Sequence, residues 1–258
     1  MVHRRNVVAG LAALPLLSLA ATRGVMAQAK TLEGDTMSTA AGDVVIHPVS
    51  HASLLVGFGS EVIYVDPVGG AALYQDLPAP TAILITHGHG DHFDLPTLEA
   101  IAGDAPILTT QEVYGKLPPA LAANARALAN GDSADLVGIP LEAVPAHNTT
   151  PERMQYHPVG VGNGYLLTFG DKVIYIAGDT EPTPEMLALS GVEIAFLPMN
   201  LPYTMTVEQA AEAINTFKPR VVYPYHHRGS DLEALKAAVD EGIEVRIANW
   251  YPNGEDAG

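Results

Sequence analysis

The sequence predicts an α/β protein in which two mixed β-sheets pack face to face with helices outside them, a four-layer αβ/βα sandwich. Short strand patterns fill the first part of the chain, whereas strands and helices alternate later. The 258 residues are 48% hydrophobic and 16% charged, which is typical of a folded interior and not of a disordered chain. No fixed-period repeat is visible, so we expect a single domain over residues 44–258.

The predicted strands are short runs rich in Val, Ile and Leu. They cover residues 44–49, 53–58, 61–66, 81–86, 141–146, 172–177, 192–197, 220–225 and 243–249. Helices are predicted where proline, Thr or Asp stands at a helix start, over residues 96–102, 119–129, 184–189, 206–217 and 231–241. This order of elements is the basis for the two-sheet architecture.

Residues 1–29 predict a signal peptide. The positively charged pair Arg4-Arg5 precedes an uncharged run over residues 6–21, and Ala27-Gln28-Ala29 fits a cleavage site. The apolar run is shorter than the roughly 20 residues that a membrane-spanning helix needs. Paired arginines favour the twin-arginine route, and therefore a periplasmic location. The alternative is an N-terminal core helix, and residues 30–43, rich in Thr, Gly, Ser and Ala, predict a flexible leader after cleavage.

Residues 86–94 (THGHGDHFD) carry the most informative pattern in the chain. They follow the apolar run at residues 81–86, so the polar side chains lie on the loop that leaves a buried strand. Three imidazoles and two carboxylates so close together favour binding of a cation, and imidazole-rich sets favour zinc. The alternative interpretation is a solvated His-rich loop. The spacing therefore predicts a metal site at this strand end.

Other potential ligands also follow predicted strands. His147 comes after residues 141–146, Asp179 after residues 172–177, and His226-His227 after residues 220–225. A single histidine after a strand is more often a packed or surface residue, and a Gly-Asp pair is usually a turn. Their repetition at successive strand ends is what indicates one shared site.

The chain resembles the metallo-β-lactamase superfamily from about Val44 to the C-terminus. The motifs that carry the resemblance are His51-Ala52-Ser53, Asp66-Pro67, the run from His87 to His92, Gly178-Asp179-Thr180, residues 203–206 and Pro224-Tyr225-His226. They are most similar to the branch of ascorbate-phosphate lactonases and N-acyl-phosphatidylethanolamine phospholipase D. The resemblance implies that His87, His89 and His147 hold one metal. It implies that Asp91, His92 and His226 hold a second, with Asp179 bridging both.

Several assignments stay open at this point. His157 lies in the loop after His147 and competes with it for the first metal. His147 is favoured because it directly follows a strand, whereas a loop residue loses conformational entropy on ordering, and His157 is then expected to be a substrate-side residue. His227 is either a substrate-side or a structural residue, and the same two readings apply to His51. Arg153 is either a clamp for a substrate anion or an exposed surface residue.

The function implied is hydrolysis of a small ester, lactone or phosphodiester by a hydroxide that two divalent metal ions activate, zinc with manganese as the alternative. Asp91 would be both a metal ligand and the catalytic proton acceptor. The rival hypothesis is a non-catalytic periplasmic metal- or ligand-binding module on the same scaffold. Oligomeric state is not predicted.

Net charge limits the classes of binding partner, and cysteine content excludes one class of enzyme. The net charge is −16, and the signal segment contributes only positive charge, so the rest of the chain is more acidic still. Such a surface repels polyanions and anionic membranes, which predicts a small-molecule substrate, no nucleic acid and no stable membrane association. Because the chain has no cysteine, β-lactamases that bind their second metal through cysteine are excluded.

Overall fold

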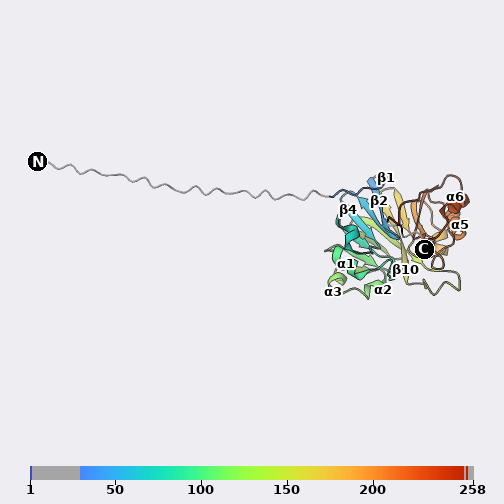
Figure 1. Cartoon of the computed structure of the whole chain (residues 1–258), viewed down its shortest axis with the longest axis horizontal. Helices are drawn as coiled ribbons and strands as arrows, with labels where there is room; N and C mark the ends of the chain where they lie inside the picture. The colour runs from blue at the N-terminus through green and yellow to red at the C-terminus, as the bar shows by residue number, and fades with distance from the viewer. Residues whose placement is uncertain (2–29, 253, 255–258) are drawn as a thin grey trace.

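The computed structural model describes Met1, residues 30–252 and Gly254, and the predicted signal peptide lies outside these residues (Figure 1). Two seven-stranded sheets form its centre. The first contains, in spatial order, β1 (Asp35–Thr39), β2 (Gly42–Ser50), β3 (Ser53–Phe58), β4 (Glu61–Val65), β5 (Ala82–Leu84), β6 (Ile107–Thr109) and β7 (Ala125–Ala127). The second contains β14 (Glu244–Val245), β13 (Val221–Tyr225), β12 (Val192–Pro198), β11 (Lys172–Ile176), β10 (Gly162–Phe169), β9 (Ile139–Ala146) and β8 (Ser133–Leu136).

Helices cover the outer side of each sheet. The first sheet carries η1 (Ala71–Tyr74), α1 (Leu95–Ile101), α2 (Gln111–Tyr114) and α3 (Pro119–Ala122), and the second carries α4 (Pro184–Leu187), α5 (Val207–Phe217) and α6 (Leu232–Ala238). In Figure 1 the green helices α1 to α3 and the red helices α5 and α6 lie on opposite sides of the strands. The longest helix, α5, begins with a capping box in which Thr206 and Gln209 satisfy each other's backbone N–H groups.

The largest hydrophobic cluster lies between the two sheets. It joins residues of the first sheet such as Ile63 and Leu84 with residues of the second such as Phe196 and Tyr223. Trp250, near the C-terminus, is fully buried in the same cluster, with its ring 6.1 Å from that of Phe196. The predicted αβ/βα sandwich is confirmed.

The sheets bring the carboxyl ends of several strands to one edge. Strands β4 to β7 run parallel to one another, as do β11 to β14. The two sheets meet there through backbone hydrogen bonds from Asn163 N–H to the Thr86 carbonyl (3.0 Å) and from His226 N–H to the His51 carbonyl (3.0 Å). Ligand sites in such sheets form beyond the carboxyl ends of parallel strands, which is where the predicted metal ligands lie.

Some predicted elements differ from the structure. The expected flexible leader is wrong from residue 35 onward, because β1 pairs antiparallel with β2 and buries Met37 in the central cluster. The helix expected over residues 119–129 ends at Ala122, and Ala125–Ala127 instead form β7, the edge strand beside β6. Within the described part of the chain, no helix combines the length and hydropathy that crossing a membrane requires.

Candidate metal centre

Asp66, directly after β4, holds the histidine-rich loop in place. Its fully buried carboxylate accepts hydrogen bonds from the backbone N–H and the hydroxyl of Thr86, both at 2.7 Å. The same carboxylate lies 2.7 Å from Nδ1 of His92, which must donate because a carboxylate only accepts. When the ring of His92 is neutral, its Nε2 atom therefore carries the lone pair that a metal needs. In the sequence, Asp66 stands out only as part of the Asp66-Pro67 motif, and its place at the end of a predicted strand was the available signal.

Asp179 lies at the centre of the histidines. Gly178 precedes it with φ +64°, and a Cβ there would come 2.9 Å from the Asn163 carbonyl, so the tight turn after β11 requires glycine. The Oδ1 atom of Asp179 lies 3.2 Å from Nε2 of His92. Its Oδ2 atom lies 3.3 Å from Nε2 of His157, 3.3 Å from that of His226 and 3.9 Å from that of His87. One buried carboxylate thus contacts four imidazoles.

The ligand atoms fall into overlapping groups. Within each group all ligand atoms lie within 4.8 Å of one another. The groups are His87, His89 and His157; His87, His92 and Asp179; and His51, Asp91 and His226. The structure therefore brings together the sequence-predicted residues His87, His89, Asp91, His92, Asp179 and His226, and it adds His51 and His157.

The preference for His147 is corrected by this geometry. His147 follows β9, but its Nδ1 lies 3.1 Å from the carbonyl of Asn148, and the residue belongs to none of the ligand groups. Its backbone serves instead: the N–H donates to the Thr180 hydroxyl (3.0 Å), and the carbonyl accepts from Glu181 N–H (3.1 Å). His147 thus supports the segment after Asp179, while His157 lies in the ligand group with His87 and His89.

The loop over residues 148–157 is held firmly enough to present His157. The N–H of Asn148 donates to the His157 carbonyl (2.9 Å), which closes the loop on itself. The side-chain amide of Asn148 donates to the carbonyls of Arg153 (2.9 Å) and Tyr203 (2.7 Å). Nδ1 of His157 also donates to the Tyr203 carbonyl (3.0 Å), which leaves its Nε2 facing Asp179.

Asp91 stands at the open side of the centre, with 48% of its side chain exposed. Its Oδ2 atom lies 3.2 Å from Nε2 of His226 and 3.3 Å from Nε2 of His51. The other ring nitrogen of His51 lies 3.0 Å from the hydroxyl of Tyr251. His51, an open assignment in the sequence, therefore lies beside the Asp91 carboxylate and lines the pocket there.

Electrostatics favour the metal-binding forms of His87, His89, Asp91 and Asp179 but not that of His92. Burial lowers the pKa of His87 well below its ordinary value and also lowers that of His89. Burial alone would raise the pKa of Asp179, but the neighbouring His226 and His92 hold it well below its ordinary value. The pKa of Asp91 is likewise held low, against the effect of burial, by hydrogen bonds from His226 and His51. Neutral imidazoles and ionised carboxylates are the ligand forms that divalent cations require. Burial alone would lower the pKa of His92, but the carboxylates of Asp179 and Asp66 hold it well above its ordinary value, so a cation that binds there would displace a proton.

Buried polar atoms at the centre also fit a cation. Nε2 of His92, Nε2 of His157 and Oδ1 of Asp179 are buried without a hydrogen-bond partner among the described residues. Such atoms are costly unless something satisfies them. They converge, and their donor set of imidazole nitrogen and carboxylate oxygen suits zinc and related divalent ions.

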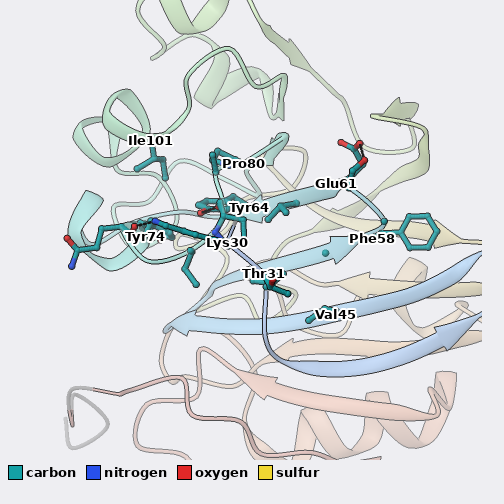
Figure 2. A pocket seen from close by; sticks show the side chains of 18 of the residues that line it. Lys30, Thr31, Val45, Phe58, Glu61, Tyr64, Tyr74, Pro80 and Ile101 are labelled. Atoms are coloured by element: carbon teal, nitrogen blue, oxygen red, sulfur yellow. Dashed lines mark hydrogen bonds between the residues drawn. The ribbon is translucent and has the colours of Figure 1, made fainter. Parts of the chain in front are cut away.

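The cavities around the centre lie on two sides of it. A pocket of about 570 Å³ is lined by His51, Asp91, Tyr156, Tyr203 and Arg228 among others. A second, of about 580 Å³, shares His89, Tyr156 and His157 with it and extends toward residues 158–163. A larger groove of about 1020 Å³ lies elsewhere, on the outer side of the first sheet between Lys30, Val45, Tyr64 and Ile101 (Figure 2). No residue of the ligand groups lines that groove, so the chemistry belongs to the smaller pockets.

The positions of two further residues bear on their open assignments. His227 is buried against the ring of Tyr251 (5.1 Å) and does not line the pockets at the centre, which favours the structural assignment over the substrate-side one. The guanidinium of Arg153 forms an ion pair with the buried carboxylate of Glu181.

Comparison with known proteins places this centre in a family. The model of the beta-lactamase superfamily domain matches residues 62–227. A UPF0173 metal-dependent hydrolase of Deinococcus radiodurans is 31% identical over 177 residues, which cover 65% of this chain and 77% of that protein. One from Pyrococcus horikoshii is 29% identical over 214 residues, which cover 77% and 93%. A crystal structure of a Parabacteroides distasonis protein is 42% identical with a TM-score of 0.77, over 84% of this chain and 98% of that one.

The matched region contains every residue of the ligand groups except His51. The superfamily predicted from the sequence motifs is confirmed by this match and by the relatives. The chain belongs to the metallo-β-lactamase superfamily and is a metal-dependent hydrolase.

Proposed function

We propose that the protein hydrolyses a small ester, lactone or phosphodiester at a centre of two divalent cations, most simply zinc. His87, His89 and His157 would hold one cation, and Asp91, His92 and His226 would hold the other. Asp179 would be a ligand to both. The observation that carries this proposal is the buried Asp179 carboxylate, whose two oxygens contact imidazoles of both ligand sets. A single tetrahedral ion takes four ligands, whereas eight side chains converge here, and seven of them are assigned as ligands above.

Bound cations would supply a water of lowered pKa and polarise the oxygen under attack. The protein's own contribution is to place a proton acceptor beside that water. Asp91 is ionised and half exposed toward the pocket, and it is aligned by contacts from His226 and His51 to its Oδ2 atom. It is therefore placed to orient the attacking water and to accept its proton.

The surroundings of the centre favour a small substrate. The pockets of about 570 and 580 Å³ that flank it are within the usual size of small-ligand sites. The half-buried ring of Tyr156 and the exposed ring of Tyr203 pack edge to face at 5.1 Å and form an apolar wall at the mouth. The net charge of −16 opposes binding of nucleic acid and of anionic membranes.

A chromogenic substrate panel tests the activity. Metal-loaded protein would be assayed on 4-nitrophenyl esters, a lactone with a pH indicator and bis(4-nitrophenyl) phosphate. Turnover of at least one class should fall by about 100-fold or more in Asp91→Asn, because the proton acceptor is lost. The matched control is Asp76→Asn, an exposed carboxylate away from the centre. Absence of turnover in the entire panel would favour a non-catalytic binding module instead.

We also propose that the protein is exported by the twin-arginine route and acts in the periplasm. The support is the sequence of residues 1–29 alone, with Arg4-Arg5 before the uncharged run. Replacing both arginines by lysine keeps the charge but should strand the precursor in the cytoplasm. Fractionation and immunoblotting measure this, and normal periplasmic accumulation of the lysine variant would rule the route out.

A further inference from the structure

Arg228 is the one arginine or lysine among the described residues that line the active-site pocket. The same pocket carries the carboxylates of Asp91 and Asp179, and the whole chain is strongly acidic. A positive charge at such a mouth is therefore unusual in this protein. It raises the question of what the guanidinium binds.

The guanidinium of Arg228 has no carboxylate partner among the described residues. Its side chain is exposed, and its Cζ atom lies 5.7 Å from the centre of the Tyr251 ring. Most other described lysines and arginines lie within ion-pair distance of a carboxylate. These are Lys116, Arg153, Lys172, Lys218, Arg220, Lys236 and Arg246. The charge of Arg228 is thus left available at the pocket.

The backbone of Arg228 is fixed relative to the metal ligands. Arg228 follows His226 by two residues, so the two Cα atoms lie within roughly 7 Å of each other. Its N–H donates to the hydroxyl of Tyr251 (3.1 Å), which also lies 3.0 Å from Nδ1 of His51. The adjacent turn is closed by a hydrogen bond from Ser230 N–H to the His227 carbonyl (2.8 Å). Arg228 therefore starts from a rigid position on the side of the pocket where His51 and Asp91 lie.

Arg228 also connects the active-site pocket with a neighbouring cavity of about 650 Å³. It lines both cavities together with Asn200, and the second cavity continues past Leu201, Met205 and Val207. A substrate whose scissile bond lies at the metal ligands can thus reach Arg228 with one end. Glu208 and Asp231 also line the second cavity, but neither lies within ion-pair distance of Arg228 among the described contacts. Guanidinium groups bind carboxylate and phosphate through paired hydrogen bonds.

We propose that Arg228 binds an oxyanion, carboxylate or phosphate, on the substrate, and thereby selects anionic substrates for this hydrolase. The proposal rests on the proposed hydrolytic function and adds the charge of the substrate to it. Arg228 contacts the non-reacting end of the substrate. Its loss should therefore raise KM for anionic substrates and leave neutral substrates unaffected.

The kinetic test uses two esters that differ in one charge. Mono-4-nitrophenyl adipate ends in a carboxylate, and its methyl ester has nearly the same shape without the charge. Arg228→Met should lower kcat/KM for the charged ester about tenfold, chiefly through KM, and should change the neutral ester little. Arg228→Lys should restore part of the loss. The matched control is Arg126→Met. Arg126 is exposed on β7 and, like Arg228, has no carboxylate partner among the described residues, but it lies outside the pocket.

A binding measurement keeps this proposal separate from the activity. Calorimetric titration of metal-loaded wild type and Arg228→Met with adipate and with inorganic phosphate shows which oxyanion is preferred. About tenfold weaker binding of the preferred anion by Arg228→Met supports the role, even if neither ester is hydrolysed. Equal loss of turnover on both esters, unchanged anion binding in the variant, or no anion binding by the wild type would each overturn it.

Discussion

The carboxylate of Glu181 is fully buried and forms an ion pair with the guanidinium of Arg153, which links the segment after Asp179 to the loop that carries His157. Glu181 also accepts hydrogen bonds from the N–H groups of Thr149 (2.7 Å) and Thr150 (2.5 Å). Arg153 in turn donates to the Thr204 carbonyl (2.8 Å). This one buried ion pair therefore fixes the positions of Asp179 and His157, two ligands of the proposed centre, relative to each other.

Removal of Arg153 should therefore affect both stability and metal retention. Arg153→Met leaves the Glu181 carboxylate buried without its cation, and breaking such a pair typically costs about 3 to 5 kcal/mol. We expect a free energy of unfolding lower by about 3 kcal/mol and weaker retention of the metal at His157. Urea denaturation and dialysis against a weak chelator measure the two effects. Lys236→Met, which breaks an exposed pair with Glu233, should cost less than about 1 kcal/mol, and an equal cost for both variants would contradict this role.

Asp66 should matter for metal affinity although it touches no metal in the proposed scheme. Asp66→Asn weakens the hydrogen bond that fixes the ring of His92, whose Nδ1 lies 2.7 Å from the carboxylate. Loss of such a supporting carboxylate typically lowers metal affinity about 10- to 100-fold. Competition with a chromophoric chelator measures the affinity, with exposed Asp76→Asn as the control. An affinity equal to that of the wild type would show that His92 is oriented by other contacts.

The pH dependence of stability should depend in part on Glu193. Burial raises its pKa, but Arg220 and Lys172 hold the pKa of Glu193 below its ordinary value. A depressed carboxyl pKa stabilises the folded state above the unfolded pKa of about 4.3, and this contribution is lost as the pH falls through the folded pKa. Glu193→Gln should therefore lower stability at pH 7 by roughly 1 kcal/mol and matter less below about pH 4. Denaturation of the wild type and the variant at both pH values measures this effect. A larger loss of stability in acid than at pH 7 would contradict the prediction.

The sequence predicted the residues whose position follows from strand ends. His226 directly follows β13, and His87 and Asp179 lie within three residues of the ends of β5 and β11. Parallel strands bring their carboxyl ends to one edge, so the convergence of these residues could be inferred without a structure. The two-sheet order followed from the same patterns. The strand β1 was missed because its residues, DTMST, have little apolar content, and it is ordered by pairing with β2.

His157 could not be assigned from local sequence. The entropy argument against it treated residues 148–157 as a loose loop, but that loop is ordered by partners distant in the sequence. These are the carbonyl of Tyr203 and the carboxylate of Glu181. The helix predicted over residues 119–129 was wrong for a similar reason, because Ala125–Ala127 pair with β6 and form an edge strand. Long-range contacts decided both cases.

Metal content of two single variants tests the central claim most directly. His157 and His147 are the same residue type, ten positions apart, and the structure places only His157 with the other ligands. By elemental analysis after gentle purification in metal-supplemented medium, the wild type should carry about two divalent ions per chain. His147→Ala should keep both, and His157→Ala should retain about one. One ion or none in the wild type, or loss of metal from His147→Ala with retention in His157→Ala, would contradict the account.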